Sequence, residues 1–153
     1  MSRFIARFSI FPKELFRLNN GNTIRIRDRA VKRVGSFDVT TEDGKVKPKA
    51  VDHPDTYQPP NGASMRPNTK TQHDLVKNFI GKDMIVYSVP LGTKLPDDLT
   101  LVHEKGDHFS LQPTREMTLE EFNSKINEFY RMSAKQFTRE QWLEAYPSPS
   151  ETA

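Results

Sequence analysis

The chain has 153 residues, of which 35% are hydrophobic and 28% charged, and its net charge is +3 at pH 7. This length is enough for a single packed domain, and the lack of cysteine excludes disulfides and thiolate chemistry. No window approaches the roughly 20 apolar residues of a spanning helix, and no secretory signal pattern is present, so we expect a soluble, cytoplasmic protein. Residues 1–49 hold 12 Lys and Arg against 5 Asp and Glu. Such a field attracts phosphate groups, although solvated surface is its commoner cause.

The first 27 residues predict β structure. Residues 1–13 are basic and apolar, which favours a short β lead-in over a targeting sequence. Residues 13–18 alternate in polarity, which puts Arg17 on the same strand face as an apolar neighbour. From this pattern alone, the favoured interpretation of Arg17 is a side chain that reaches the surface along its apolar stem. Residues 23–27 alternate again and turn their arginines outward.

The next stretch predicts loops. Residues 35–60 have no helical period and contain a turn signal at residues 42–44, so we expect a hairpin followed by a long loop, a candidate lid. Tyr57 gives this loop an aromatic ring that could stack on a ligand. Ser64 follows within the small-residue turn 61–65. It has no G-x-S-x-G context and no histidine near it in sequence, so a hydrolase nucleophile is not expected there.

Three helices are predicted. The first begins at an Asn68 cap and closes at Gly81, with an apolar face formed by Leu75, Val76 and Phe79. The second follows a capping box formed by Thr118 and Glu121. The third is short, contains Trp142 and follows a box formed by Thr138 and Gln141. The final residues, 147–153, are expected to be disordered.

Residues 83–113 carry the strongest strand signals. Runs at 84–89, 99–103 and 109–111 are rich in β-branched and aromatic residues, and the last two flank a turn that contains Gly106. A period of two groups His108 with Ser110 and Gln112 on one polar face.

The sequence lacks the motifs of a metal site, of the common nucleotide-binding folds and of an RNA-binding sheet. His103 and His108 could face each other across the hairpin, but a third ligand is missing, so no metal site is predicted. No phosphate-binding P-loop or dinucleotide fingerprint occurs. Basic and aromatic residues mix near the start without the pattern of an RNA-binding sheet, so nucleic acid is not the expected partner.

One group of residues resembles a known family. It consists of Pro90, Gly92, Thr93, Leu95, Pro96, Asp98 and Leu99, followed by His108, Phe109, Ser110, Leu111 and Pro113, and it is preceded by Leu15, Phe16, Arg17 and by Tyr57, Pro59, Gly62, Ser64. This pattern is similar to the NAD-dependent toxin family of bacterial type VI secretion systems and its fungal relatives.

The resemblance implies an α+β fold with two small packed sheets, ADP-ribosyltransferase-like, and NAD in the cleft between them. The toxin domain would occupy residues 14–131, preceded by the lead-in and followed by a short helix and tail. Arg17, Tyr57 and Ser64 would bind NAD, with Ser64 and His108 as catalytic residues. A cognate immunity protein and an intracellular target would be the partners. The family places threonine before the serine, whereas this chain has Ala63.

No carboxylate that would support the cationic transition state can be placed by motif. Glu104 is the nearest substitute, and pairing His103 with His108 would put it on the opposite face. Three hypotheses follow: an NAD-dependent toxin enzyme, acting as a transferase or a glycohydrolase, a non-catalytic NAD-binding module of the same fold, and a nucleic-acid adaptor.

Overall fold

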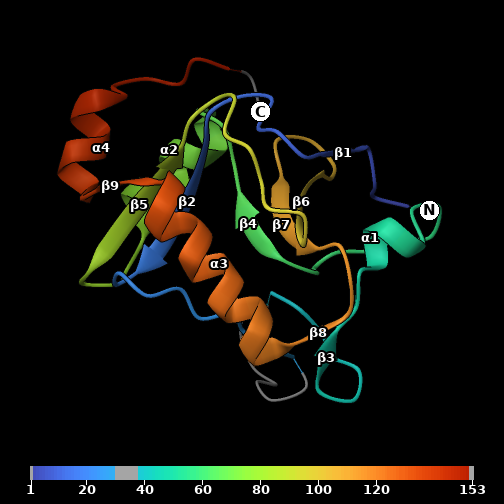
Figure 1. Ribbon diagram of the computed structural model, residues 1–153. Helices are drawn as coiled ribbons and strands as arrows, with labels where there is room; N and C mark the ends of the chain where they lie inside the picture. Colours follow the sequence, from blue (N-terminus) through green and yellow to red (C-terminus); the bar gives the residue numbers. More distant parts are fainter. Residues whose placement is uncertain (1, 30–37, 152–153) are drawn as a thin grey trace.

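A computed structural model describes residues 2–29 and 38–151. Within them the strands form three antiparallel sheets, accompanied by four helices (Figure 1). The four-stranded sheet has the strand order β1 (Ala6–Phe8), β6 (Leu99–His103), β7 (Phe109–Pro113) and β4 (Ala63–Met65). The three-stranded sheet has the order β2 (Leu15–Asn20), β5 (Met84–Val89) and β9 (Lys135–Phe137). The small sheet pairs β3 (Lys45–Val46) with β8 (Met117–Thr118). The expected α+β class is confirmed, and the small sheet is an addition to the two that were predicted.

The predicted β core forms as three strands, but its hairpin register differs from the expected one. Gly106 adopts a φ of +70°, as the turn requires, and the backbone N–H of Glu104 donates to the carbonyl of His108 at 2.9 Å. The loop therefore includes Asp107 as a third residue. Because of this extra residue, His103 lies opposite Phe109, and the predicted pairing of His103 with His108 is wrong.

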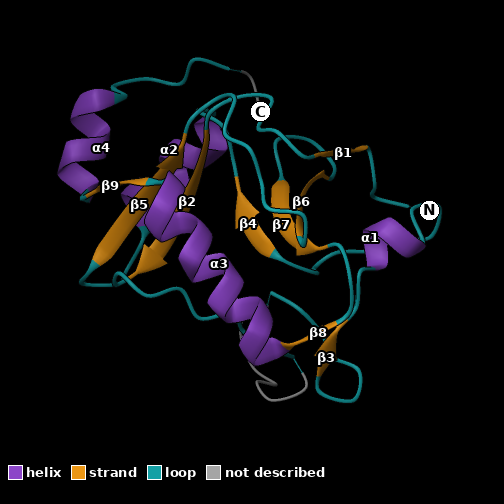
Figure 2. Ribbon diagram, in the orientation of Figure 1, coloured by secondary structure: helices purple, strands orange, loops and turns teal. Residues whose placement is uncertain are grey.

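The two larger sheets meet where β2 passes β4. Phe16 and Arg66 exchange backbone hydrogen bonds of 2.7 and 2.9 Å, and beyond this bridge the two strands join different sheets. Arg17 lies one residue past the bridge on β2, and Ser64 lies near it on β4. The strands that carry these two residues are thus held together by the backbone at one point (Figure 2).

β2 alternates between two hydrophobic cores, as its pattern predicts. Leu15 faces the main core, which is filled from both larger sheets and from α3 (Leu119–Ser133). Phe16 faces the second core, where it packs edge-on against Trp142 of α4 (Arg139–Ala145) at 5.3 Å between ring centroids. Successive residues of β2 therefore point to opposite sides of the three-stranded sheet.

The helices begin at the predicted hydroxyl caps, with one change. α2 (Lys70–Asn78) starts after Thr69 rather than Asn68 and buries Gln72, His73 and Val76, while Leu75 is 39% exposed. The predicted apolar face of this helix is thus partly wrong. Thr138 and Gln141 form the complete capping box of α4. At α3, Thr118 caps the helix, but the Glu121 carboxylate contacts Arg115 instead of closing the box.

Two segments depart from the expected loops. The turn at residues 42–44 forms as predicted, with Asp43 and Gly44 at positive φ, but a short helix, α1 (Lys49–Asp52), follows it. Residues 35–37 of the predicted lid lie outside the described residues. The tail was expected to be disordered, yet the backbone N–H groups of Ser150 and Glu151 both donate to the carbonyl of Asn68.

Residues 24–27 are extended but do not belong to a sheet. Their backbone is held by α3 instead: the Asn127 side chain accepts from the Ile24 N–H at 2.8 Å and donates to its carbonyl at 2.7 Å. Asn123 accepts from the Ile26 N–H at 2.8 Å. Arg25 and Arg27 face outward, as predicted. None of the described helices has the length and apolar character needed to cross a membrane.

Candidate active site

Ser64 and His108 form the centre of the candidate site. Antiparallel pairing of β4 with β7 puts Ser64 opposite Ser110 and brings it close to His108 at the start of β7. His108 Nε2 lies 2.9 Å from Ser64 Oγ, and both side chains are partly exposed. No histidine lies near Ser64 in sequence, but strand pairing brings it to a histidine 44 positions away.

Glu104 completes a line of three polar side chains. Its carboxylate contacts Nδ1 of His108, and the glutamate is only 2% exposed. The expectation that Glu104 lies on the opposite face from His108 is wrong, for the same reason as the histidine pair: the longer loop makes Glu104 and His108 the closing pair of the hairpin. With Nδ1 against Glu104, Nε2 is the ring nitrogen of His108 that faces the Ser64 hydroxyl.

Tyr57 supports this line from behind. Its hydroxyl donates to the second oxygen of Glu104 and accepts from Gln112 Nε2 at 2.7 Å. Burial, and then the negative charge of Glu104, raise the pKa of the Tyr57 hydroxyl, which therefore stays protonated. Tyr57 is 2% exposed, so its ring packs within the protein.

Arg17 approaches Ser64 from the other sheet. Its Nη1 donates to the backbone carbonyl of Ser64 at 3.2 Å, while its Nε is buried without a hydrogen-bond partner. The side chain is 6% exposed, which contradicts the surface interpretation that its pattern favoured. A buried guanidinium whose Nε has no partner can still bind an anion or a hydroxyl.

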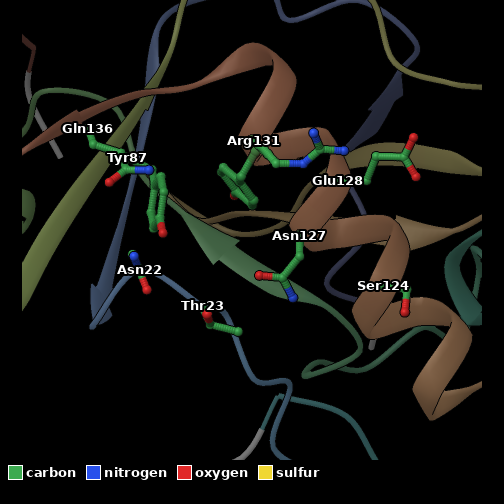
Figure 3. A pocket seen from close by; sticks show the side chains of 9 residues that line it. Asn22, Thr23, Tyr87, Ser124, Asn127, Glu128, Arg131 and Gln136 are labelled. Atoms are coloured by element: carbon green, nitrogen blue, oxygen red, sulfur yellow. The ribbon is translucent and has the colours of Figure 1, made fainter.

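One hollow is lined by Arg17 and a second by its strand partner Tyr87. The first, smaller one, of about 300 Å³, contains Arg17 itself together with Arg25 and Arg27, three guanidinium groups. A larger groove, of about 580 Å³, lies between α3 and the three-stranded sheet (Figure 3). Tyr87, the cross-strand partner of Arg17, lines this groove. The smaller hollow has the charge that a diphosphate requires, whereas the larger groove is lined mainly by amides, hydroxyls and aromatic rings.

The structure thus brings Arg17 and His108 into contact with Ser64. Tyr57 does not contact Ser64 and joins the group through Glu104. Sequence reasoning missed the link through Glu104. The signal that could have found it is the glycine-containing turn, because a three-residue loop changes the register by one.

The three antiparallel sheets and four helices of the described residues are consistent with an ADP-ribosyltransferase-like fold. A sequence profile of the family described as Tse2 ADP-ribosyltransferase toxin matches residues 13–142. The chain belongs to this family of NAD-dependent toxins. No curated protein matches it significantly.

Proposed function

We propose that this chain binds NAD at the junction of the two larger sheets and breaks the bond between nicotinamide and ribose. The observation that carries the proposal is the meeting of Arg17, Ser64 and His108 within one set of hydrogen bonds. Membership of an NAD-dependent toxin family supplies the substrate class. The unpaired Nε of Arg17 fits an anionic or hydroxyl-bearing ligand.

The charged hollow sets the orientation of the substrate. Arg17, Arg25 and Arg27 would hold the diphosphate, because guanidinium groups bind phosphate oxygens through two donors at once. Arg27 already pairs with Asp38 at 3.1 Å, so Arg25, which is exposed, is the freer of the two outer groups. The nicotinamide ribose would then lie toward Ser64 and His108.

The chemistry needs a base for the incoming nucleophile. When nicotinamide leaves, it takes the electrons of the C1′–N bond, and an oxocarbenium-like ribose remains to be attacked by an acceptor hydroxyl, an amine or water. Nε2 of His108 can accept the proton that the nucleophile loses. The contribution of Tyr57 to NAD binding would be indirect, because its hydroxyl contacts Glu104.

Calorimetry with NAD and an assay of nicotinamide release test this function. We expect saturable NAD binding and release of nicotinamide, both with wild-type protein. Binding without release would indicate a non-catalytic NAD module, and absence of both would refute the proposal. We further propose that the toxin acts in the cytoplasm of a target cell and has an immunity partner; growth arrest on expression, relieved by His108→Gln, would support the toxic activity.

The orientation has its own test in a matched pair of charge variants. Arg25→Gln removes a guanidinium from the hollow, whereas Arg7→Gln removes an exposed arginine from β1, outside it. Losing a charge-assisted contact costs about 1.5–3 kcal/mol, so Arg25→Gln should weaken NAD binding at least about tenfold, with little change for Arg7→Gln. Equal effects of the two variants would reduce the hollow to a general electrostatic field.

A further inference from the structure

We infer that Glu104 is the carboxylate this site uses, and that it works as a positioning residue through His108 instead of touching the substrate. The inference rests on the proposed function and adds to it a residue that no motif identifies. It starts from burial: a carboxylate that is 2% exposed cannot reach a ribose, yet a buried charge persists only with partners.

Glu104 lies in the middle of one line of polar side chains, between Tyr57 and His108. Gln112 donates to Tyr57, and Tyr57 donates to Glu104. The Glu104 carboxylate forms an ion-pair contact with Nδ1 of His108, and Nε2 of the same ring lies 2.9 Å from Ser64 Oγ. Because an ionised carboxylate only accepts hydrogen bonds, Glu104 would place the ring proton on Nδ1 and so fix both the orientation and the tautomer of His108. Gln112 is itself held in place by a second bond, to Ser110 Oγ at 2.7 Å.

Other charges near the turn have their own partners. Asp107 accepts from Thr69 Oγ1 at 2.6 Å and lies 3.5 Å from the Arg66 guanidinium. Arg17 is directed at the Ser64 carbonyl. Glu104 is therefore the carboxylate that His108 meets among the described residues.

The Glu104 side chain is not required to form the hairpin. The hairpin is already closed by the backbone bond from Glu104 N–H to His108 carbonyl, and the turn is formed by Gly106. The side chain is not needed for that closure. What it adds is an acceptor for Nδ1–H, which leaves Nε2 free to take a proton from the nucleophile.

In the proposed step, the bond between nicotinamide and ribose is replaced by a bond between the nucleophile and ribose. The nucleophile forms its bond to ribose C1′, the C1′–N bond breaks and its electrons leave with neutral nicotinamide. The proton of the nucleophile moves to Nε2 of His108, and the resulting imidazolium is stabilised by the adjacent Glu104 carboxylate. This arrangement departs from one in which a carboxylate stabilises the ribose cation by direct contact.

The first test is the tautomer of His108 in wild-type protein, read from the ring ¹⁵N chemical shifts. We expect the neutral ring to carry its proton on Nδ1, and an Nε2-protonated ring would overturn the inference. This measurement needs no NAD, so it decides the point even if the proposed function fails.

The second test is Glu104→Gln, in which an amide replaces the carboxylate and can donate to Nδ1. We expect the tautomer to switch and kcat for nicotinamide release to fall on the order of 10²-fold or more, with NAD affinity changed by less than about threefold. Tyr57→Phe, which removes only the hydroxyl behind Glu104, should lower kcat less and preserve the tautomer. A folded Glu104→Gln protein with wild-type kcat, or with lost kcat and an unchanged tautomer, would overturn the positioning role. Should Glu104→Gln fail to fold, the wild-type shifts and Tyr57→Phe decide.

Discussion

At the scale of single residues, Arg17 shows how much a local pattern leaves undecided. The alternating pattern of β2 correctly puts Arg17 on the same face as Leu15, which meets the main core. The same pattern, however, fits a surface arginine as well as a buried one. Burial follows from β4, which lies across the bridge at Phe16 and supplies the Ser64 carbonyl as an acceptor. That contact is tertiary and leaves no trace in the sequence of β2.

The variant Arg17→Lys separates charge from geometry. Lysine keeps the charge and one donor for the Ser64 carbonyl but lacks the planar fork and the unpaired Nε. We expect NAD binding to weaken by about 1–3 kcal/mol, the cost of a lost charge-assisted hydrogen bond, while the melting temperature falls only slightly. Calorimetry and thermal unfolding of the same sample measure both. Wild-type affinity in the lysine variant would show that Arg17 acts through charge alone.

At the scale of elements, the strands within residues 84–111 and two capped helices were predictable, whereas strand pairing was not. The turn predicted at residues 61–65 is wrong, because β4 (Ala63–Met65) forms there by pairing with β7. The run at Met84–Val89 was predicted to the residue, because β-branched residues end at Pro90, which cannot donate to a ladder. The boxes at Thr118 and Thr138 located two helix starts. By contrast, the register between β6 and β7 depends on one extra loop residue, and this decides whether Glu104 meets His108.

The join between α3 and the extended residues 24–27 is an element-scale interaction that can be tested. Asn127 satisfies both backbone groups of Ile24, so Asn127→Leu would leave a donor and an acceptor without partners. We expect a loss of about 2–6 kcal/mol in the free energy of unfolding, measured by urea denaturation, at about 1–3 kcal/mol for each of the two unsatisfied groups.

Ser124→Ala is the matched control for this variant. Ser124 lies on the same helix with its side chain exposed, so its replacement should change stability by less than about 0.5 kcal/mol. If the two variants have equal stability, residues 24–27 are held by hydrophobic contacts rather than by these hydrogen bonds.

At the scale of the whole molecule, three tyrosines are buried and Tyr146 is partly buried. All four, Tyr57, Tyr87, Tyr130 and Tyr146, have a raised pKa, with desolvation as the first cause at each. For Tyr146 the pKa rises to about 12, helped by a hydrogen bond to Glu14. A raised pKa in the folded state means that folding disfavours the tyrosinate form.

Because the pKa values of the tyrosines are higher in the folded protein, its stability decreases at alkaline pH. The tyrosines contribute stability that is fully present below their unfolded pKa of about 10 and is lost as the pH rises through their folded values. For Tyr146 this window runs from about 10 to about 12. Tyrosinate absorbance should therefore be nearly absent in folded protein at pH 10 and about half-developed in urea. Equal titration curves in the two conditions would contradict the buried placement of the rings.

The two cores on either side of β2 also have a spectroscopic consequence. Trp142 is the single tryptophan of the chain, fully buried with Phe16 and His73, whereas Arg17 points to the opposite side of the same sheet. Leu18 and Phe79 pack against the core that contains Trp142, and both also line the hollow with Arg17. Intrinsic fluorescence will thus report the docking of α4 on the three-stranded sheet and, through these two side chains, the binding of a ligand in the hollow. A change in tryptophan emission during an NAD titration is therefore the expected outcome for a protein that binds NAD in this hollow.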